Sequence, residues 1–329
     1  MDHDFFAAQR RLRRRSWALI ALLFLLLWAL TNFFLVGLYS RRSCPTGTAC
    51  ETMYHWNVTV MAITAAAVAA YLLLASLVTS RAMVGGHGIR EATGPETTVP
   101  RNVVAEVAIG AGVPAPHVFV LDEPSLNAFA VSDGRRHGAV VVTSGLIAAL
   151  DRRELTGVVA HELAHIRNRD SRVLVVAMSA VGVLLVAATV AVTVAALAGQ
   201  AVRGAGKGRG VVIVGGLAFA ALVVALVLRV IALPAALLIR AALSRRREEL
   251  ADASAVQFTR DPGGLRRALE KIAGDTAAPA DIGSLARALC IERPQGPPRS
   301  GWLERWMGTH PPISRRIAWL RALEGASGA

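Results

Sequence analysis

Cysteine is scarce in this sequence and lysine is almost absent. The 329 residues include three cysteines, and none forms a C-x-x-C pair or has zinc-finger spacing. That argues against a thiolate metal cluster. Cys44 and Cys50 lie in one short segment between two apolar runs. They would form a disulfide if that segment faces an oxidising compartment, and two free thiols are the equally open alternative.

Lys207 and Lys271 are the only lysines, so arginine supplies nearly all of the positive charge behind the formal net charge of +13. A strongly basic chain is typical of nucleic-acid-binding proteins. Here the basic residues cluster beside apolar runs instead of lining one solvated face. We therefore interpret them as signals of membrane topology and expect no nucleic-acid partner.

Apolar residues make up 54% of the chain and its mean hydropathy is positive, which is too apolar for two soluble domains. Four apolar runs are long enough to cross ~30 Å of hydrocarbon as helices. They are residues 17–39, 58–78, 173–198 and 211–232. The first run exceeds the core of a signal peptide, so it predicts an anchor. We predict an integral membrane protein, mainly α with a small β-sheet, whose spans form two hairpins in the lipid bilayer.

Charge asymmetry predicts the orientation of these hairpins. Five arginines between positions 10 and 15 precede the first span, which places the N-terminus in the cytoplasm of a plasma-membrane protein. Two crossings return the chain to that side. The link 201–210 carries three basic residues, which disfavours the outer side, so the depth of the second hairpin stays open. The predicted parts are 1–80, 81–172, 173–239 and 240–329.

The segment between the hairpins has soluble character. It begins with a Gly-rich linker and a helix-like stretch at 101–112. Runs rich in β-branched and aromatic residues then predict strands at 118–121, 128–131 and 139–143. Asp151 with Glu154 three residues later forms a capping box, which predicts a helix that begins there and runs through His165.

That predicted helix carries a motif with chemical meaning. His161, Glu162 and His165 form H-E-x-x-H, and the i, i+4 spacing turns both imidazoles to one helix face, where they can share a metal ion. Glu162 is placed to take a proton from water at the metal as a general base. The alternative is a surface helix with two solvated histidines, but apolar positions on the same helix argue against it.

A catalytic zinc site needs a third protein ligand. No histidine lies six residues after His165, which argues against a three-histidine site. In the segment Ser244–Asp252, Glu248 and Asp252 lie four residues apart on one helix face. Glu248 could bind the metal while Asp252 orients a histidine ligand. Without the upstream motif, a solvated charge run would be the simpler interpretation.

Several landmarks in order resemble one family, the HtpX family of membrane-bound zinc metalloproteases, and more distantly the CAAX prenyl proteases. They are H-E-L-A-H-I-R-N-R-D (161–170), an apolar hairpin, S-R-R-R-E-x-x-A-D (244–252), T-H-P-P-I-S-R-R-I (309–317) and N-A-F-A (127–130). The resemblance implies a gluzincin-like α+β protease domain with one Zn²⁺ per chain. It further implies cytoplasmic hydrolysis of protein or peptide substrates, above all membrane or misfolded proteins, in quality control.

The same resemblance implies site residues. His161, His165 and Glu248 would bind zinc, and Glu162 would be the catalytic base. The family usually has an aromatic residue where this chain has Glu249, so Glu249 is a competing ligand, although only Glu248 lies four residues before Asp252.

Three further roles follow from the resemblance or have simpler alternatives beside it. His310 or Arg316 could donate to the oxyanion of the attacked carbonyl. Asp170 either positions the catalytic helix or its ligands, or only caps a helix end. Gly138–Thr143 is either an edge strand that pairs with an extended substrate or a plain core strand.

Other function classes fit the sequence less well. In an ion transporter the motif would line a path in the membrane, but His161 and His165 lie outside the apolar spans among arginines. A catalytically silent scaffold with a structural zinc would have no use for Glu162. A processing protease of the CAAX type resembles a larger chamber with more spans than the four predicted here.

Overall fold

The computed structural model describes residues 89–132, 138–204, 209–275 and 311–327, together with scattered positions between 14 and 71. The described positions in 18–29 and in 59–71 are helical. Most of the predicted first hairpin, the pair Cys44 and Cys50, and His310 lie outside the described residues.

The described residues fall into two compact units. The first unit holds those of Met1–Ala18, Ser76–Val175 and Ala241–Ala329, and the second holds those of Leu19–Ala75 and Val176–Arg240. Two long helices, α6 (Asp170–Gly204) and α8 (Leu233–Thr259), begin in one unit and end in the other. The first unit is therefore made of separate chain segments.

A mixed sheet is the centre of the first unit. Its strands are β1 (Ile89–Glu91), β2 (His117–Leu121), β3 (Ala128–Ser132) and β4 (Gly138–Thr143). The order is β1-β2-β4-β3, with β2 and β4 parallel and the outer pairs antiparallel. Strand β4 is thus a core strand, and in the described part of the chain the edge on its side belongs to β3. The predicted strands are confirmed, and β1, too short to give a pattern, was not predicted.

Both faces of β4 are buried, which explains its unbroken valine run. Val140 and Val142 contribute to the main core with α3 (Thr98–Ala111), α5 (Arg152–Asn168) and α9 (Pro262–Ala273). Val141 contributes to a smaller cluster on the other face that includes Val175 at the start of α6. The short elements η2 (Pro95–Thr97) and α4 (Ser144–Ala149) complete this part of the unit.

Helix α5 is defined at both ends by local chemistry. Asp151 accepts a hydrogen bond from the Glu154 amide and the Glu154 side chain accepts one from the Asp151 amide, which confirms the capping box. At the other end Arg169 has a left-handed backbone (φ 57°), and α6 begins at the next residue. A single residue therefore joins the two helices.

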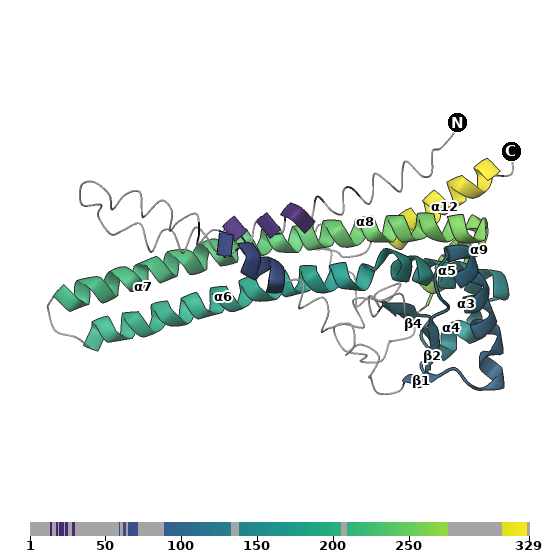
Figure 1. Cartoon of the computed structure of the whole chain (residues 1–329), viewed down its shortest axis with the longest axis horizontal. Helices are drawn as coiled ribbons and strands as arrows, with labels where there is room; N and C mark the ends of the chain where they lie inside the picture. The colour runs from purple at the N-terminus through teal and green to yellow at the C-terminus, as the bar shows by residue number, and fades with distance from the viewer. Residues whose placement is uncertain are drawn as a thin grey trace. The chain divides into compact units, whose positions relative to one another are not determined.

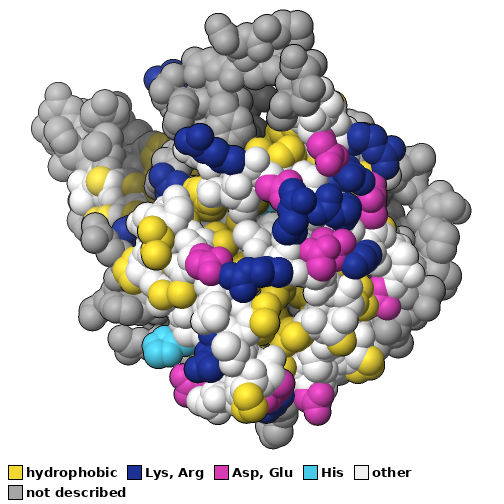
Figure 2. All heavy atoms as spheres, turned by 90° about the vertical axis from the view of Figure 1, so that its right-hand side faces the viewer, with side chains coloured by type: hydrophobic (Ala, Val, Ile, Leu, Met, Phe, Trp, Pro, Cys, Tyr) yellow, Lys and Arg dark blue, Asp and Glu magenta, His cyan; other side chains and the backbone are white. Residues whose placement is uncertain are grey.

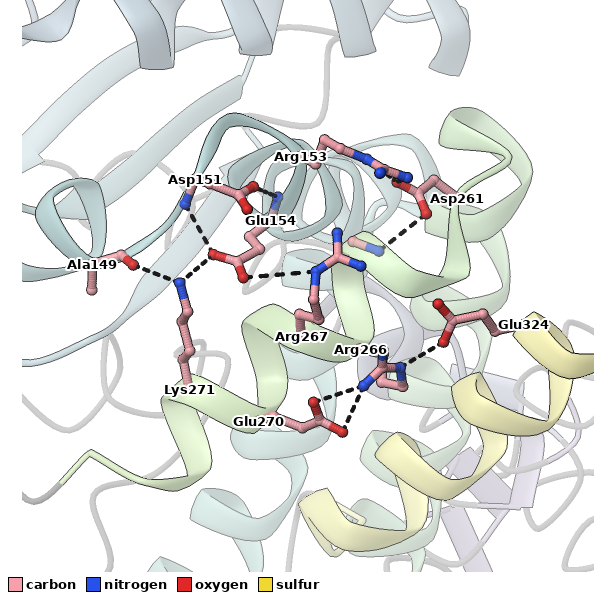
Figure 3. A network of polar contacts seen from close by, with 11 residues as sticks. Ala149, Asp151, Arg153, Glu154, Asp261, Arg266, Arg267, Glu270, Lys271 and Glu324 are labelled. Carbon is pink, nitrogen blue, oxygen red and sulfur yellow. Dashed lines mark hydrogen bonds and ion pairs between the residues drawn. The ribbon is translucent and has the colours of Figure 1, made fainter.

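An ion-pair network holds the start of α5 against α9 (Figure 3). The Glu154 carboxylate is buried; it accepts from Lys271 Nζ at 2.6 Å and lies 3.8 Å from Arg267 Nε. On the outer side of α9, Arg266 bridges Glu270 and Glu324, and Glu324 belongs to α12 (Ile313–Ser327). These contacts hold α12 against α9, and α9 in turn packs against α5.

The surface of the first unit is charged with both signs. On the face shown in Figure 2, basic and acidic side chains lie next to one another. The ion pairs of this unit include Arg153–Asp261 and Arg321–Glu270, whose arginine side chains are exposed. The described part of that face therefore presents no continuous field of one sign.

The second unit contains apolar helices. Helix α6 is followed by α7 (Arg209–Val227), a π-helical turn η3 (Leu228–Ala232) and α8 (Figure 1). Two stretches, Ala177–Arg203 and Val214–Thr259, are long and apolar enough to cross a membrane. Many large apolar side chains on them are more than a third exposed, which suits contact with lipid. Examples are Leu185, Val186, Val190, Leu197, Phe219, Leu222, Leu226 and Val230.

Candidate metal centre

Helix α5 places the H-E-x-x-H residues inside the first unit. His161 and Glu162 are 0% and 1% exposed, and His165 is partly buried. One helical turn separates the two histidines, and their Nε2 atoms lie 3.1 Å apart. Both imidazoles therefore point to the same place.

Helix α8 supplies an acidic side chain to that place. The Glu248 carboxylate oxygens lie 3.4 Å from His161 Nε2 and 3.7 Å from His165 Nε2. The candidate ligand atoms of these three residues all lie within 4.8 Å of one another. The neighbouring Glu249 instead pairs with Arg246 Nη1 at 2.7 Å and is about a third exposed. The geometry thus brings Glu248, and not Glu249, to the histidines.

The far nitrogen of each imidazole faces its own carboxylate. His161 Nδ1 lies 2.9 Å from Asp252 Oδ1, and His165 Nδ1 lies 2.7 Å from Asp170 Oδ2. Each contact favours the tautomer in which Nδ1 carries the proton and donates a hydrogen bond to the carboxylate. Both Nε2 atoms then present lone pairs to each other, an arrangement that a shared cation would satisfy.

The charges of the site also fit a divalent cation. Among the described residues, its buried charged groups are four carboxylates and two guanidiniums, a formal charge of −2 when all four carboxylates are ionised and both imidazoles are neutral. They are Glu162, Asp170, Glu248, Asp252, Arg247 and Arg316. A net charge buried without compensation is strongly unfavourable. Two imidazole nitrogens and a carboxylate are the donor set of many catalytic zinc sites.

The pKa values of the two histidines are shifted in opposite directions. Burial and the charge of Arg316 oppose protonation of His161, but hydrogen bonds to Asp252 and Glu248 raise its pKa to about 9. Burial, followed by the charge of His161, lowers the pKa of His165 to about 3. In the metal-free site the pair therefore favours a proton on His161 beside Glu248, and a metal ion bound through both Nε2 atoms would displace that proton.

Glu162 points into the same buried region. Among the described residues, neither of its carboxylate oxygens has a hydrogen-bond partner by distance and angle. Burial is the main cause that raises the pKa of Glu162 to about 7, and the charge of Glu248 adds to the rise. The nearby amide of Ala130 in β3 acts in the opposite direction and lowers the pKa of Glu162. A carboxylate with this pKa can both accept and release a proton near neutral pH.

Strand β3 presents outward-facing backbone groups beside Glu162. Thr143 N donates to Asn127 O, so this pair is hydrogen-bonded, and hydrogen-bonded pairs alternate with the other kind along an antiparallel ladder. The N–H and C=O groups of Ala128, Ala130 and Ser132 consequently point away from β4. They form a row of donors and acceptors at the edge of the described sheet, in which the Ala128 amide already donates to Asn127 Oδ1.

Arg316 of α12 forms two hydrogen bonds with Asp252. Its Nε and Nη2 donate to the two carboxylate oxygens at 2.8 and 2.7 Å, and its Nη1 lies 3.4 Å from Glu248 Oε2. Arg316 as a whole is 5% exposed. Its shortest contacts are those to Asp252, and they support a role in orienting that carboxylate. Oxyanion donation by Arg316 or His310 stays a prediction.

Sequence reasoning missed one charged residue of the site. Arg247 Nη2 contacts Asp170 Oδ1, so this arginine belongs to the buried cluster. Its position next to Glu248 was the one hint in the sequence. The partner Asp170 is far away in sequence, and no periodicity joins the two.

Comparison with known proteins gives the family. The model of peptidase family M48 matches residues 96–324. The Protease HtpX homolog of Caldanaerobacter subterraneus is 32% identical over 94% of this chain and 95% of its own length. That of Thermoanaerobacter pseudethanolicus is 35% identical over 82% and 87%, and that of Streptococcus pneumoniae serotype 4 is 32% identical over 94% and 97%. The crystal structure of Ste24p from S. mikatae aligns with a TM-score of 0.45 and 18% identity over 80% of this chain and 58% of that one.

Proposed function

The chain belongs to peptidase family M48, a family of metalloproteases, and we propose that it is a membrane-bound zinc endopeptidase that degrades membrane or misfolded proteins at the cytoplasmic face. The observation that carries the proposal is the convergence of His161, His165 and Glu248 beside the buried carboxylate of Glu162. The family match accounts for the hydrolase activity, and the site residues account for how this chain performs it.

The three ligand residues would hold one zinc ion. When bound, zinc supplies Lewis acidity that polarises the scissile carbonyl and makes water more acidic. Asp252 and Asp170 keep the two imidazoles in the tautomer that leaves Nε2 free to bind a metal. Arg316 keeps Asp252 in place.

Glu162 would act as the general base. It takes the proton of the water that attacks the scissile carbonyl and then delivers a proton to the leaving amine. Its buried carboxylate oxygens and its raised pKa suit both steps. His310 is proposed as a donor to the oxyanion on the strength of the family motif alone.

The edge of β3 would bind the substrate. An extended peptide that pairs with the outward backbone groups of Ala130 and Ser132 runs past Glu162, because the amide of Ala130 is close to that carboxylate. Main-chain pairing recognises the backbone and demands little of the side chains. This is the selectivity that degradation of many misfolded proteins requires.

The cytoplasmic placement rests on charge. Arginines between positions 10 and 15 and between 240 and 247 flank apolar runs, and the positive-inside rule assigns both groups to the cytoplasm. A cysteine-free variant with Arg321→Cys, an exposed position, tests this directly. A membrane-impermeant maleimide should label it only after cell lysis. Equal labelling of intact cells would contradict the placement.

The central experiment compares detergent-purified wild type with Glu162→Gln. Each protein is assayed on an unfolded protein substrate, its zinc content is measured, and chelator and zinc re-addition serve as controls. We expect both to bind about one zinc ion and only wild type to cleave. Glu249→Gln, which removes a carboxylate outside the site, should cleave like wild type. Zinc binding without cleavage by either protein would favour a scaffold or a narrow processing enzyme, and absence of zinc from both would refute the proposal.

A further inference from the structure

A second arginine occupies the position that Arg316 occupies on the other side of the site. Asp170 accepts from His165 Nδ1 through Oδ2, and its Oδ1 contacts Nη2 of Arg247. The side chains of Asp170 and Arg247 are 8% and 10% exposed. Each candidate histidine ligand therefore continues into a carboxylate and then into a buried guanidinium.

The two arrangements use the same chemistry but come from different elements. His161 is held by Asp252 of α8 and by Arg316 of α12. His165 is held by Asp170, the first residue of α6, and by Arg247 of α8. In each case the carboxylate can stay charged while buried, because the imidazole donates a hydrogen bond to it and the guanidinium balances its charge.

Arg247 is the part of the second arrangement that keeps Asp170 charged and oriented. Without Arg247, Asp170 would be a buried carboxylate with one hydrogen-bond donor. Protonation of Asp170, or rotation of its side chain away from His165, would then lower the free energy of the protein. His165 would then lose the partner that holds the proton on Nδ1, and the tautomer with a proton on Nε2 cannot bind a metal through that atom. Arg247 is also adjacent to Glu248, so its contact with Asp170 ties the start of α6 to the helix that carries the third ligand.

We propose that Arg247 is a positioning residue for the metal centre: through Asp170 it fixes His165 as a ligand and sets α8, with Glu248, against the start of α6. This inference rests on the proposed function, because it takes His165 and Glu248 as ligands. It adds a residue that is not itself a candidate metal ligand and that acts through its contact with Asp170.

The test measures metal affinity in the full-length protein in detergent. Zinc affinity is determined by chelator competition for wild type, Arg247→Gln and Arg247→Lys, with Arg246→Gln as the matched control. Arg246 is the preceding residue of α8 and pairs with Glu249 at the surface. Arg247→Gln should lower affinity by up to the ~10–100-fold that loss of Asp170, the direct partner of His165, would cause. Arg247→Lys should recover part of that loss, and Arg246→Gln should stay within about twofold of wild type.

A double-mutant cycle shows whether Arg247 acts through Asp170. Asp170→Asn should weaken zinc binding by itself, and adding Arg247→Gln should change it little further, because an uncharged amide at position 170 no longer needs a counter-charge. The absorption spectrum of the cobalt-substituted proteins reports ligand geometry apart from activity. Arg247→Gln should alter this spectrum, and Arg246→Gln should leave it unchanged.

The outcomes separate this inference from the function it rests on. If neither wild type nor Arg246→Gln binds zinc, the proposed function itself is refuted. Wild-type zinc affinity in Arg247→Gln, or additive losses in the double variant, would overturn the role of Arg247 alone. If Arg247→Gln does not fold, Arg247→Lys decides: weakened zinc binding with an unchanged melting temperature supports the role, and unchanged binding refutes it.

Discussion

Replacing Gly157 with alanine should destabilise the first unit, because α5 and α9 come too close there for a side chain. A Cβ at Gly157 would lie 2.5 Å from Leu265 N and 2.7 Å from Leu265 Cα, both backbone atoms. Ordinary contacts begin near 3.4 Å, so α9 must move away by about 1 Å. That movement disturbs the core face of α9 and its ion pairs with Glu154.

The magnitude follows from two opposed effects. Alanine in a helix interior is favoured over glycine by ~1 kcal/mol. Forcing extra volume into a packed core costs ~1–3 kcal/mol, and the upper part of that range applies because the opposing atoms are backbone. The net loss should be about 1–2 kcal/mol. Gly325 of α12 is the matched control: nothing lies within 4 Å of its added Cβ, so Gly325→Ala should gain up to ~1 kcal/mol.

The assay is thermal unfolding of the full chain in detergent, followed by circular dichroism with zinc in excess. Gly157→Ala should lower the melting temperature and Gly325→Ala should raise it or leave it unchanged. Catalysis in Gly157→Ala should fall as well, because α5 carries His161, Glu162 and His165. Equal stabilisation by both substitutions would show that the two helices do not pack this closely, and the reasoning would fail.

Four further predictions test individual contacts. Glu248→Gln should abolish cleavage and reduce bound zinc well below one ion per chain, and equal losses in Glu249→Gln would contradict the ligand assignment. Asp252→Asn should weaken zinc binding ~10–100-fold without unfolding the protein, and an affinity like wild type would show that His161 needs no carboxylate. Glu154→Gln should cost ~1–3 kcal/mol of stability in thermal unfolding, because it leaves the α9 cations without their buried partner, and no shift in melting temperature would contradict this. Ala130→Pro removes an amide that faces away from β4, so it should lower kcat/KM for protein substrates while the fold persists; unchanged kinetics would place the substrate elsewhere.

The elements that carry the site could be predicted because their signals are local. The capping box of Asp151 and Glu154 fixed the start of α5, and the spacing of His161 and His165 fixed which helix face they share. Runs of β-branched residues gave the strands nearly to the residue. Each of these signals is contained within one element.

What could not be predicted depends on contacts between distant segments. The sequence left open whether Gly138–Thr143 is an edge or a core strand, because strand order is set by tertiary packing and not by alternation. The choice between Glu248 and Glu249 needed spacing and family resemblance, and the structure adds the physical reason: only Glu248 faces the histidines. Arg247 could not be assigned because its partner Asp170 lies on another helix.

The division of the first unit into separate chain segments has a consequence for biosynthesis. During translation the histidine pair on α5 is made first, the apolar helices of the second unit follow, and Glu248 and then Arg316 come last. A nascent chain therefore has an incomplete site until α6, α7 and α8 have been synthesised. For the same reason no single short fragment on either side of the hairpin contains the whole site. A water-soluble catalytic version of the protein would need residues 19–75 removed and residues 176–240 replaced by a linker from Val175 to Ala241.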